Sequence, residues 1–187
     1  MHWDYKFDVV VVGSGNGALT AALCSHDGGA KTLVIEKSDQ FGGTSATSGG
    51  GVWIPNNRYA KAENVDDSPE EARQYINSVS PDGMIKDELI ETYISEGPRM
   101  VDYLHENSQV KYRNLPHYPD YFPDNPGGKA GNRSMEPEPI FGTALGNDLS
   151  KLREQHPQTA FTMGPINMNF TQVEGQLLLG ALPGWKM

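Results

Sequence analysis

The chain has 187 residues, of which 37% are hydrophobic and 21% are charged, as in an ordinary globular domain. Its formal net charge of −9 argues against nucleic acid or an anionic membrane surface as a partner, because both require a basic face. No apolar run is long enough to span a bilayer, and the first residues lack the features of a signal peptide, which predicts a cytoplasmic protein without an integral membrane segment. The single cysteine, Cys24, excludes an internal disulfide framework and is expected to be a packed thiol. The five histidines lack metal-ligand spacing, so no metal site is predicted.

The first thirty-five residues have the pattern of a strand–helix–strand unit. Residues 7–12 (FDVVVV) and 32–35 (TLVI) are short β-branched runs that predict strands buried on both faces. Helix-forming residues occupy 18–26, and Gly28 and Gly29 then end the helix. Such a crossover predicts two parallel strands in one sheet.

The turn after the first strand carries a dinucleotide-binding pattern, GSGNGA. Gly13 permits the tight turn, Gly15 allows a pyrophosphate to approach the backbone, and Ala18 lets the helix pack close to the strand. Glu36 ends the second strand, where a carboxylate accepts hydrogen bonds from an unphosphorylated ribose. A glycine-rich turn of another α/β fold is the alternative. The predicted nucleotide contacts in this unit are Gly13, Ser14, Gly15, Gly17, Ala18, Glu36 and Lys37.

A second glycine-rich run, FGGTSATSGGGVWIP, occupies residues 41–55. A flexible linker is one interpretation. The position of the run, between the ribose-binding acid and the apolar residues 52–54, instead favours close contact with the flavin and pyrophosphate of an extended FAD, where side chains would collide. Small hydroxyl side chains would supply donors there. The predicted FAD contacts in this run are Gly42, Gly43, Thr44, Ser45, Ser48, Gly49, Gly50 and Gly51.

The middle of the chain, residues 68–107, is predicted to be helical. Ser68 begins a capping box with a proline at the first helical position, and this helix should run to about Val79. A second helical stretch starts near Ile85, and Gly97-Pro98 should interrupt it before it ends at about residue 106. Residues 110–113 are compatible with a short strand.

Residues 115–147 show no periodic pattern and contain six prolines. Aromatic side chains cluster at 117–122, and disordered segments are poor in aromatics, so we expect an ordered loop over a cavity. The predicted organisation is thus a dinucleotide-binding unit with a flavin loop over 1–57, a helical part over 68–107 and a proline-rich aromatic loop over 115–147.

Three stretches resemble one group of flavoenzymes: 8–23 (DVVVVGSGNGALTAAL), 33–55 (LVIEKSDQFGGTSATSGGGVWIP) and 119–137 (PDYFPDNPGGKAGNRSMEP). They are similar to the N-terminal part of the fumarate reductase and 3-ketosteroid dehydrogenase group, and the Trp-Ile-Pro at 53–55 is closer to the 3-ketosteroid Δ1-dehydrogenase branch. The resemblance implies an α/β fold, namely an incomplete Rossmann-like FAD-binding domain with a glutathione reductase-like βαβ start. Members are well over twice as long, so it also implies that the catalytic domain is absent from this chain and that the chain alone is inactive.

The resemblance implies a reaction as well. In that branch a tyrosinate-like base removes a proton from C2 of a 3-oxosteroid, and a hydride passes from C1 to the flavin. A tyrosine of a DYYP loop is expected near the base, but this chain has Phe122 at that position, which leaves Tyr121 as the candidate catalytic hydroxyl. Alternatively, both rings only form a pocket wall. A steroid-like apolar substrate and an electron acceptor are the implied partners. A fumarate reductase-like enzyme for a small dicarboxylate and a catalytically dead nucleotide-binding remnant are the alternatives.

Overall fold

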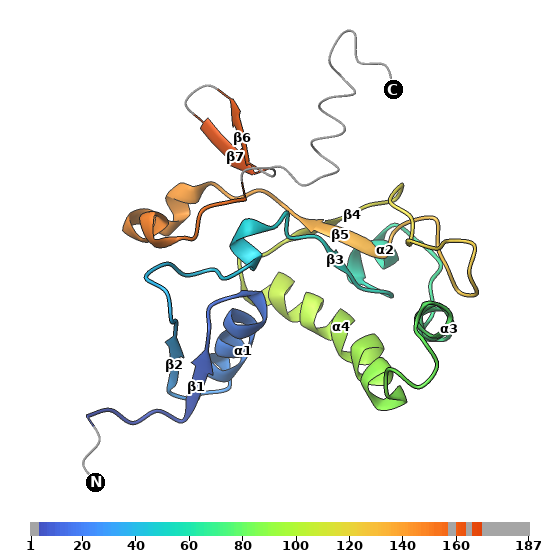
Figure 1. Cartoon of the computed structure of the whole chain (residues 1–187), viewed down its shortest axis with the longest axis horizontal. Helices are drawn as coiled ribbons and strands as arrows, with labels where there is room; N and C mark the ends of the chain where they lie inside the picture. The colour runs from blue at the N-terminus through green and yellow to red at the C-terminus, as the bar shows by residue number, and fades with distance from the viewer. Residues whose placement is uncertain (1–3, 157–159, 164–165, 170–187) are drawn as a thin grey trace. The chain divides into compact units, whose positions relative to one another are not determined.

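The computed structural model describes residues 4–156, 160–163 and 166–169 (Figure 1). The chain divides into two compact units. The first comprises Met1–Gly50 with Ile140–Met187, and the second comprises Gly51–Pro139. The organisation predicted from the sequence, with segments 1–57, 68–107 and 115–147, remains a prediction.

The first unit contains the predicted strand–helix–strand arrangement. Strand β1 (Val9–Val12) is followed by helix α1 (Asn16–Asp27) and strand β2 (Thr32–Ile35). The two strands pair in parallel, with Val9 opposite Thr32, as a crossover connection requires. Figure 1 shows α1 lying beside this pair of strands. The sequence therefore predicted this unit correctly, to within two residues at each end.

The predicted burial of this unit was wrong in two respects. Val10 and Val12 on β1 are 52% and 77% exposed, although a strand buried on both faces was expected. Cys24 is exposed, although a packed thiol was expected, and α1 has no buried residue. In the part of the chain that the structure describes, the sheet has two strands and α1 packs against them, so one row of strand side chains and much of the helix remain open to solvent.

The remainder of the first unit consists of short elements. A 3-10 helix, η1 (Ser45–Thr47), lies in the glycine-rich run, and a longer one, η2 (Gly142–Lys151), follows the second unit. A parallel bridge between Phe41 and Leu152 joins the two segments. Strands β6 (Ala160–Met163) and β7 (Ile166–Asn169) then form an antiparallel pair.

The second unit is built on a three-stranded antiparallel sheet in the order β3-β5-β4. Its strands are β3 (Val52–Trp53), β4 (Tyr112–Asn114) and β5 (Ser134–Pro137). The predicted strand at 110–113 is therefore displaced by one or two residues. The expectation of a patternless loop over 115–147 was wrong at β5, because this four-residue strand gains its order from pairing with a neighbour on each side and not from a local β-branched pattern.

Two shorter helices precede the long one. Helix α3 (Pro69–Val79) begins where the capping box predicts it, and the Ser68 hydroxyl accepts a hydrogen bond from the Glu71 N–H at 3.1 Å. Helix α2 (Arg58–Ala62) was not predicted. Its start is fixed by Asn57, whose side-chain oxygen accepts the N–H groups of Tyr59 and Ala60.

Helix α4 (Asp87–Asn107) continues through Pro98, so the predicted interruption is wrong. At the neighbouring Gly97 the helix approaches the chain after β3 closely, since a Cβ there would lie 3.3 Å from the Ile54 side chain. Residues on both sides of Pro98, among them Ile94 and Val101, are buried, so tertiary packing and not local propensity decides that the helix continues. The core beneath α4 comprises Ile54, Val101, Tyr112 and Met135.

Candidate functional site

The predicted phosphate-binding turn lies between β1 and α1. Gly13 has φ +98°, a left-handed conformation that favours glycine. A Cβ at Gly13 or at Gly17 would meet nothing within 4 Å, so neither glycine is required by packing within the described chain. Helix α1 starts at Asn16, and its N-cap, Gly15, supplies no side-chain cap. A helix N-terminus whose N-cap residue has no side chain to cap it is a place where backbone N–H groups can bind an anion.

Ser14, inside this turn, joins three segments of the chain. The side chain is buried, with the residue 3% exposed. Its hydroxyl donates to Glu36 Oε2 at 2.5 Å and accepts the backbone N–H of Gly42 at 2.9 Å. The predicted phosphate-binding turn, the end of β2 and the glycine-rich run therefore meet at one hydroxyl group.

Glu36 is held as an anion at the end of β2. Its Oε1 accepts the backbone N–H groups of Lys37 at 2.8 Å and Ser38 at 3.1 Å. The Ser14 hydroxyl, followed by these backbone donors, holds the pKa of the Glu36 carboxyl below its ordinary value. These hydrogen bonds orient both carboxylate oxygens, which are suited to accept hydrogen bonds from the hydroxyl groups of a ribose.

The glycine-rich run packs directly on the phosphate-binding turn. The Ser45 hydroxyl accepts the N–H of Asn16 at 3.0 Å, which supplies from a distance the cap that Gly15 lacks. Gly43 has φ +54°, and a Cβ there would lie 3.4 Å from the Gly15 backbone. At Gly42, φ is +109° and a Cβ would approach another Cβ of the run to 2.6 Å. The chain itself thus requires Gly42, a reason that the sequence-based interpretation did not include.

The other predicted contacts of the run lie nearby in the first unit. The Ser48 hydroxyl donates to the Ser45 carbonyl at 3.0 Å and accepts the Gly50 N–H at 3.1 Å, so it shapes the turn that follows η1. Lys37 is exposed, and Thr44 precedes η1. The exception is Gly51, which belongs to the second unit. Most of the predicted nucleotide contacts thus lie in the first unit: Gly13, Ser14, Gly15, Gly17, Ala18, Glu36, Lys37, Gly42, Gly43, Thr44, Ser45, Ser48, Gly49 and Gly50.

The sequence analysis missed a buried ionic cluster in the second unit. Arg133 is 1% exposed and forms ion pairs with Asp67 at 2.7 Å and with Asp120 at 3.0 Å. The rings of Trp53 and Tyr75 lie 5.5 and 5.8 Å from its guanidinium carbon. Trp53 Nε1 also donates to Asp120 at 2.7 Å. The sequence contained one signal for this cluster, because Arg133 lies in a glycine- and proline-rich segment that also contains acidic and aromatic residues.

This cluster supports the loop that carries the candidate catalytic residue. Tyr121 and Phe122 follow Asp120 directly and are 83% and 58% exposed. The backbone N–H of Phe122 donates to the Tyr75 hydroxyl at 3.3 Å, and the Lys129 N–H donates to Asp120 at 3.0 Å. The loop is therefore ordered around buried anchors while its two aromatic rings project from it. The catalytic role of Tyr121 remains a prediction.

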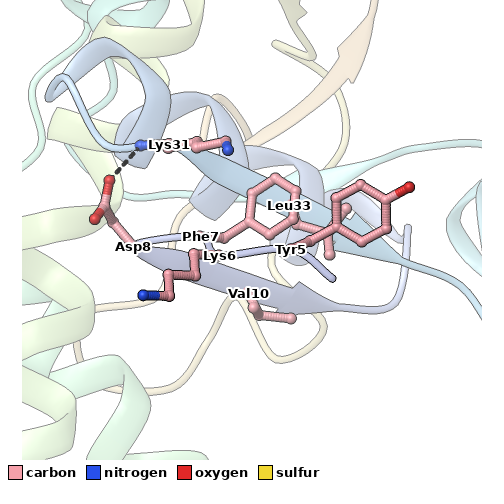
Figure 2. Close-up of a pocket in the computed structure, with 7 residues that line it drawn as sticks. All are labelled: Tyr5, Lys6, Phe7, Asp8, Val10, Lys31 and Leu33. Carbon is pink, nitrogen blue, oxygen red and sulfur yellow. Dashed lines mark hydrogen bonds between the residues drawn. The ribbon is translucent and has the colours of Figure 1, made fainter. Parts of the chain in front are cut away.

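A separate pocket lies in the first unit and contains none of the predicted site residues (Figure 2). It is lined by Tyr5, Lys6, Phe7, Asp8, Val10, Lys31 and Leu33. The Lys31 N–H donates to Asp8 at 2.8 Å, and the Lys31 ammonium lies 4.8 Å from the centre of the Phe7 ring. Among residues 4–156, 160–163 and 166–169, no group of three His, Cys, Asp or Glu side chains could hold a metal ion. No helix within these ranges combines the length and apolarity needed to cross a membrane.

Comparison with known proteins gives consistent matches. The model of a family described as "FAD binding domain" matches residues 8–173. The chain is 40% identical to the 3-oxosteroid 1-dehydrogenase of Mycolicibacterium smegmatis over 168 residues, which is 90% of this chain. It is 38% identical over 84% of its length to the 4-oxocyclohexanecarboxylate 2-dehydrogenase of Sinomonas cyclohexanicum.

A solved structure matches the fold. The 3-ketosteroid Δ1-dehydrogenase of Sterolibacterium denitrificans, in complex with 1,4-androstadiene-3,17-dione, covers 96% of this chain with a TM-score of 0.83 and 38% identity. The predicted fold class, an incomplete Rossmann-like FAD-binding domain, is confirmed by this match. The chain spans 29% of the length of the M. smegmatis relative, 27% of the S. cyclohexanicum relative and 31% of the S. denitrificans chain.

Proposed function

Because the chain belongs to the FAD binding domain family, we propose that the residues gathered around the β1–α1 turn hold the adenosine diphosphate part of FAD. FAD is the cofactor of this domain. One observation carries the proposal: the Ser14 hydroxyl bonds at once to the ribose-binding acid Glu36 and to the glycine-rich run at Gly42. The pyrophosphate would then face the N–H groups after Gly13, and the ribose would face Glu36. The remaining proposed contacts are Gly15, Gly17, Ala18, Lys37, Gly43, Thr44, Ser45, Ser48, Gly49, Gly50 and Gly51.

The space around the turn and the charge of Glu36 also support the proposed contacts. Added Cβ atoms at Gly13 and Gly17 would meet no other part of the described chain, so side chains there would project into the space that a pyrophosphate needs. The carboxylate of Glu36 is kept ionised by three hydrogen bonds, and no 2′-phosphate would be tolerated beside it. These residues fit a dinucleotide with an unphosphorylated ribose.

For the complete protein we propose FAD-dependent dehydrogenation of a 3-oxosteroid between C1 and C2. The support is the 40% identity to a 3-oxosteroid 1-dehydrogenase over most of this chain. Bound FAD would accept the hydride, and the protein would supply orientation and a dry environment. Within this chain, the exposed rings of Tyr121 and Phe122 would contribute an apolar surface suited to a steroid, with Tyr121 as the hydroxyl of the pair. An external electron acceptor would reoxidise the cofactor.

Two measurements test the proposal. First, the thermal midpoint of the 187-residue chain is measured with and without FAD, because a ligand that binds only the native state must raise it. A Gly17→Ala variant is the control, since the added Cβ would meet nothing within 4 Å in the described chain and would lie beside the proposed phosphate position. Equal midpoints with and without FAD would contradict the FAD site and favour a nucleotide-binding remnant without function.

Second, the complete gene product that contains this chain is assayed with a 3-oxosteroid, with 4-oxocyclohexanecarboxylate and with fumarate. The steroid should be the best substrate by kcat/KM. Preference for the cyclohexane acid would assign the chain to the chemistry of its S. cyclohexanicum relative, and preference for fumarate would support the dicarboxylate alternative.

We also place the protein in the cytoplasm. Its one cysteine is a free and exposed thiol, a state that a reducing compartment maintains. Fractionation of cells that express the complete protein tests this assignment.

A further inference from the structure

We propose that Ser14 is a positioning residue, which fixes Glu36 and the glycine-rich run in the geometry that FAD requires without being a necessary contact of the cofactor. This inference rests on the proposed FAD site. The fingerprint assigns functions to Gly13, Gly15 and Ala18, but the residue between the two glycines is unrestricted in it. In this structure the residue at that position, Ser14, bonds to two other segments of the chain.

Ser14 differs from its neighbours in the turn because it is buried. Ser14 is the one buried residue of the segment 13–18, and its hydroxyl points into the chain toward β2 and the run. The hydroxyl donates its proton to Glu36, and one of its lone pairs accepts the Gly42 N–H, so both of these bonds are made within the protein. A buried hydroxyl that already has a donor and an acceptor partner is suited to alignment.

The Glu36 carboxylate depends on Ser14 for its orientation toward the turn. The other two partners of its carboxylate are the N–H groups of Lys37 and Ser38, which are its neighbours in the sequence and move with it. The Ser14 bond spans 22 residues and fixes the carboxylate to the start of α1. The backbone also joins the turn to β2, because the Gly13 N–H donates to the Ile35 carbonyl at 2.7 Å, so the Ser14 bond fixes the orientation of the Glu36 carboxylate on a strand that is already in place.

Gly42 depends on Ser14 in the same way. Its φ of +109° is unfavourable for other residues, and the Ser14 hydroxyl takes up its N–H at 2.9 Å. The bond spans 28 residues and directs the run back over the turn, where the Ser45 hydroxyl then caps Asn16. A single substitution at Ser14 should consequently loosen both halves of the cofactor site.

The experiment is a double-mutant cycle on FAD affinity in the full 187-residue chain, with Ser14→Ala, Glu36→Ala and the double variant. The dissociation constant is measured by quenching of flavin fluorescence, at a temperature where circular dichroism shows every variant folded. Ser14→Ala should weaken FAD binding by about tenfold, the scale of a lost hydrogen bond to a charged group. In the Glu36→Ala background the same substitution should weaken binding by only about two- to threefold, because residues in one network are not additive. Ser14→Cys, with similar size and a weak donor, should give an intermediate affinity.

A matched control is Ser25→Ala, which removes a hydroxyl near the other end of α1 that bonds to the Ala21 carbonyl at 2.7 Å. It should leave FAD affinity unchanged. Equal penalties for Ser14→Ala in both backgrounds, or an affinity of Ser14→Ala equal to that of the unsubstituted chain, would overturn the inference while leaving the FAD site intact. Failure of the unsubstituted chain to bind FAD would instead overturn the proposed function, and the positioning role with it.

Discussion

Replacing Arg133 by Met should destabilise the second unit severely. The side chains of Arg133, Asp67 and Asp120 are 2%, 6% and 1% exposed, so the substitution leaves two buried carboxylates without their cation. Breaking a buried ion pair by removing one partner costs about 3–5 kcal/mol, and we expect about 4 kcal/mol here. The loss of the contacts with the rings of Trp53 and Tyr75 adds to this cost. Such a loss is a large share of the roughly 5–15 kcal/mol by which a domain is stable.

Urea unfolding followed by Trp53 fluorescence measures this effect, with Trp3 and Trp185 replaced by Phe so that one probe remains. With a slope of about 1–3 kcal/mol per molar urea, the midpoint should fall by about 2 M. Arg99→Met is the matched control, because the Arg99–Glu96 pair is exposed and its loss should cost less than about 0.5 kcal/mol.

A further variant separates buried charge from lost packing. Combining Arg133→Met with Asp67→Asn and Asp120→Asn removes all three charges, and it should recover a large part of the stability. A loss below about 1 kcal/mol for Arg133→Met alone, or one equal to that of the Arg99 control, would refute the reasoning. No recovery in the triple variant would attribute the loss to packing.

Four other predictions concern single residues. Gly42→Ala should destabilise the first unit by about 2–3 kcal/mol, because the new Cβ is both strained at φ +109° and too close to a neighbour. Gly17→Ala should leave the thermal midpoint unchanged or higher but weaken FAD binding, and a lower midpoint would contradict this. Asn57→Ala should lower the free energy of unfolding in urea by about 2–3 kcal/mol, because the buried amide caps α2 with its oxygen and donates to two backbone carbonyls. A loss below about 0.5 kcal/mol, the cost of a surface substitution, would count against that role. Because the pKa of Glu36 is lowered, chiefly by Ser14, its carboxylate stabilises the fold above its ordinary pKa, and this contribution is lost as the pH falls through the lowered pKa. Ser14→Ala should move that loss to higher pH in an acid titration, and superimposable profiles would show that the hydroxyl does not hold the charge.

The local pattern of the sequence was sufficient for the nucleotide-binding unit. The boundaries of β1, α1 and β2 follow from short apolar runs and from glycines, and Glu36 is placed by its distance from the turn. The start of α3 follows from a capping box whose hydrogen bond the structure contains. In these segments the determining interactions lie within a few residues of each other, and a sequence pattern can record them.

Elsewhere the determining partner is distant in the sequence. Pro98 predicted a break in α4, but Ile54 packs against Gly97 and the helix continues. The strand at 134–137 has no strand-like pattern, and it forms because β3 and β4 pair with it.

What the sequence by itself determined is the βαβ start, its glycine turn, the position of the acid proposed to bind ribose and the expectation of FAD, because backbone conformation and short-range spacing specify each of them. Only the tertiary structure revealed that Ser14 connects Glu36 with Gly42, and that Arg133 lies buried between Asp67 and Asp120. These bonds join residues 13 to 66 positions apart, and no local pattern specifies which polar side chains are brought together when the chain folds.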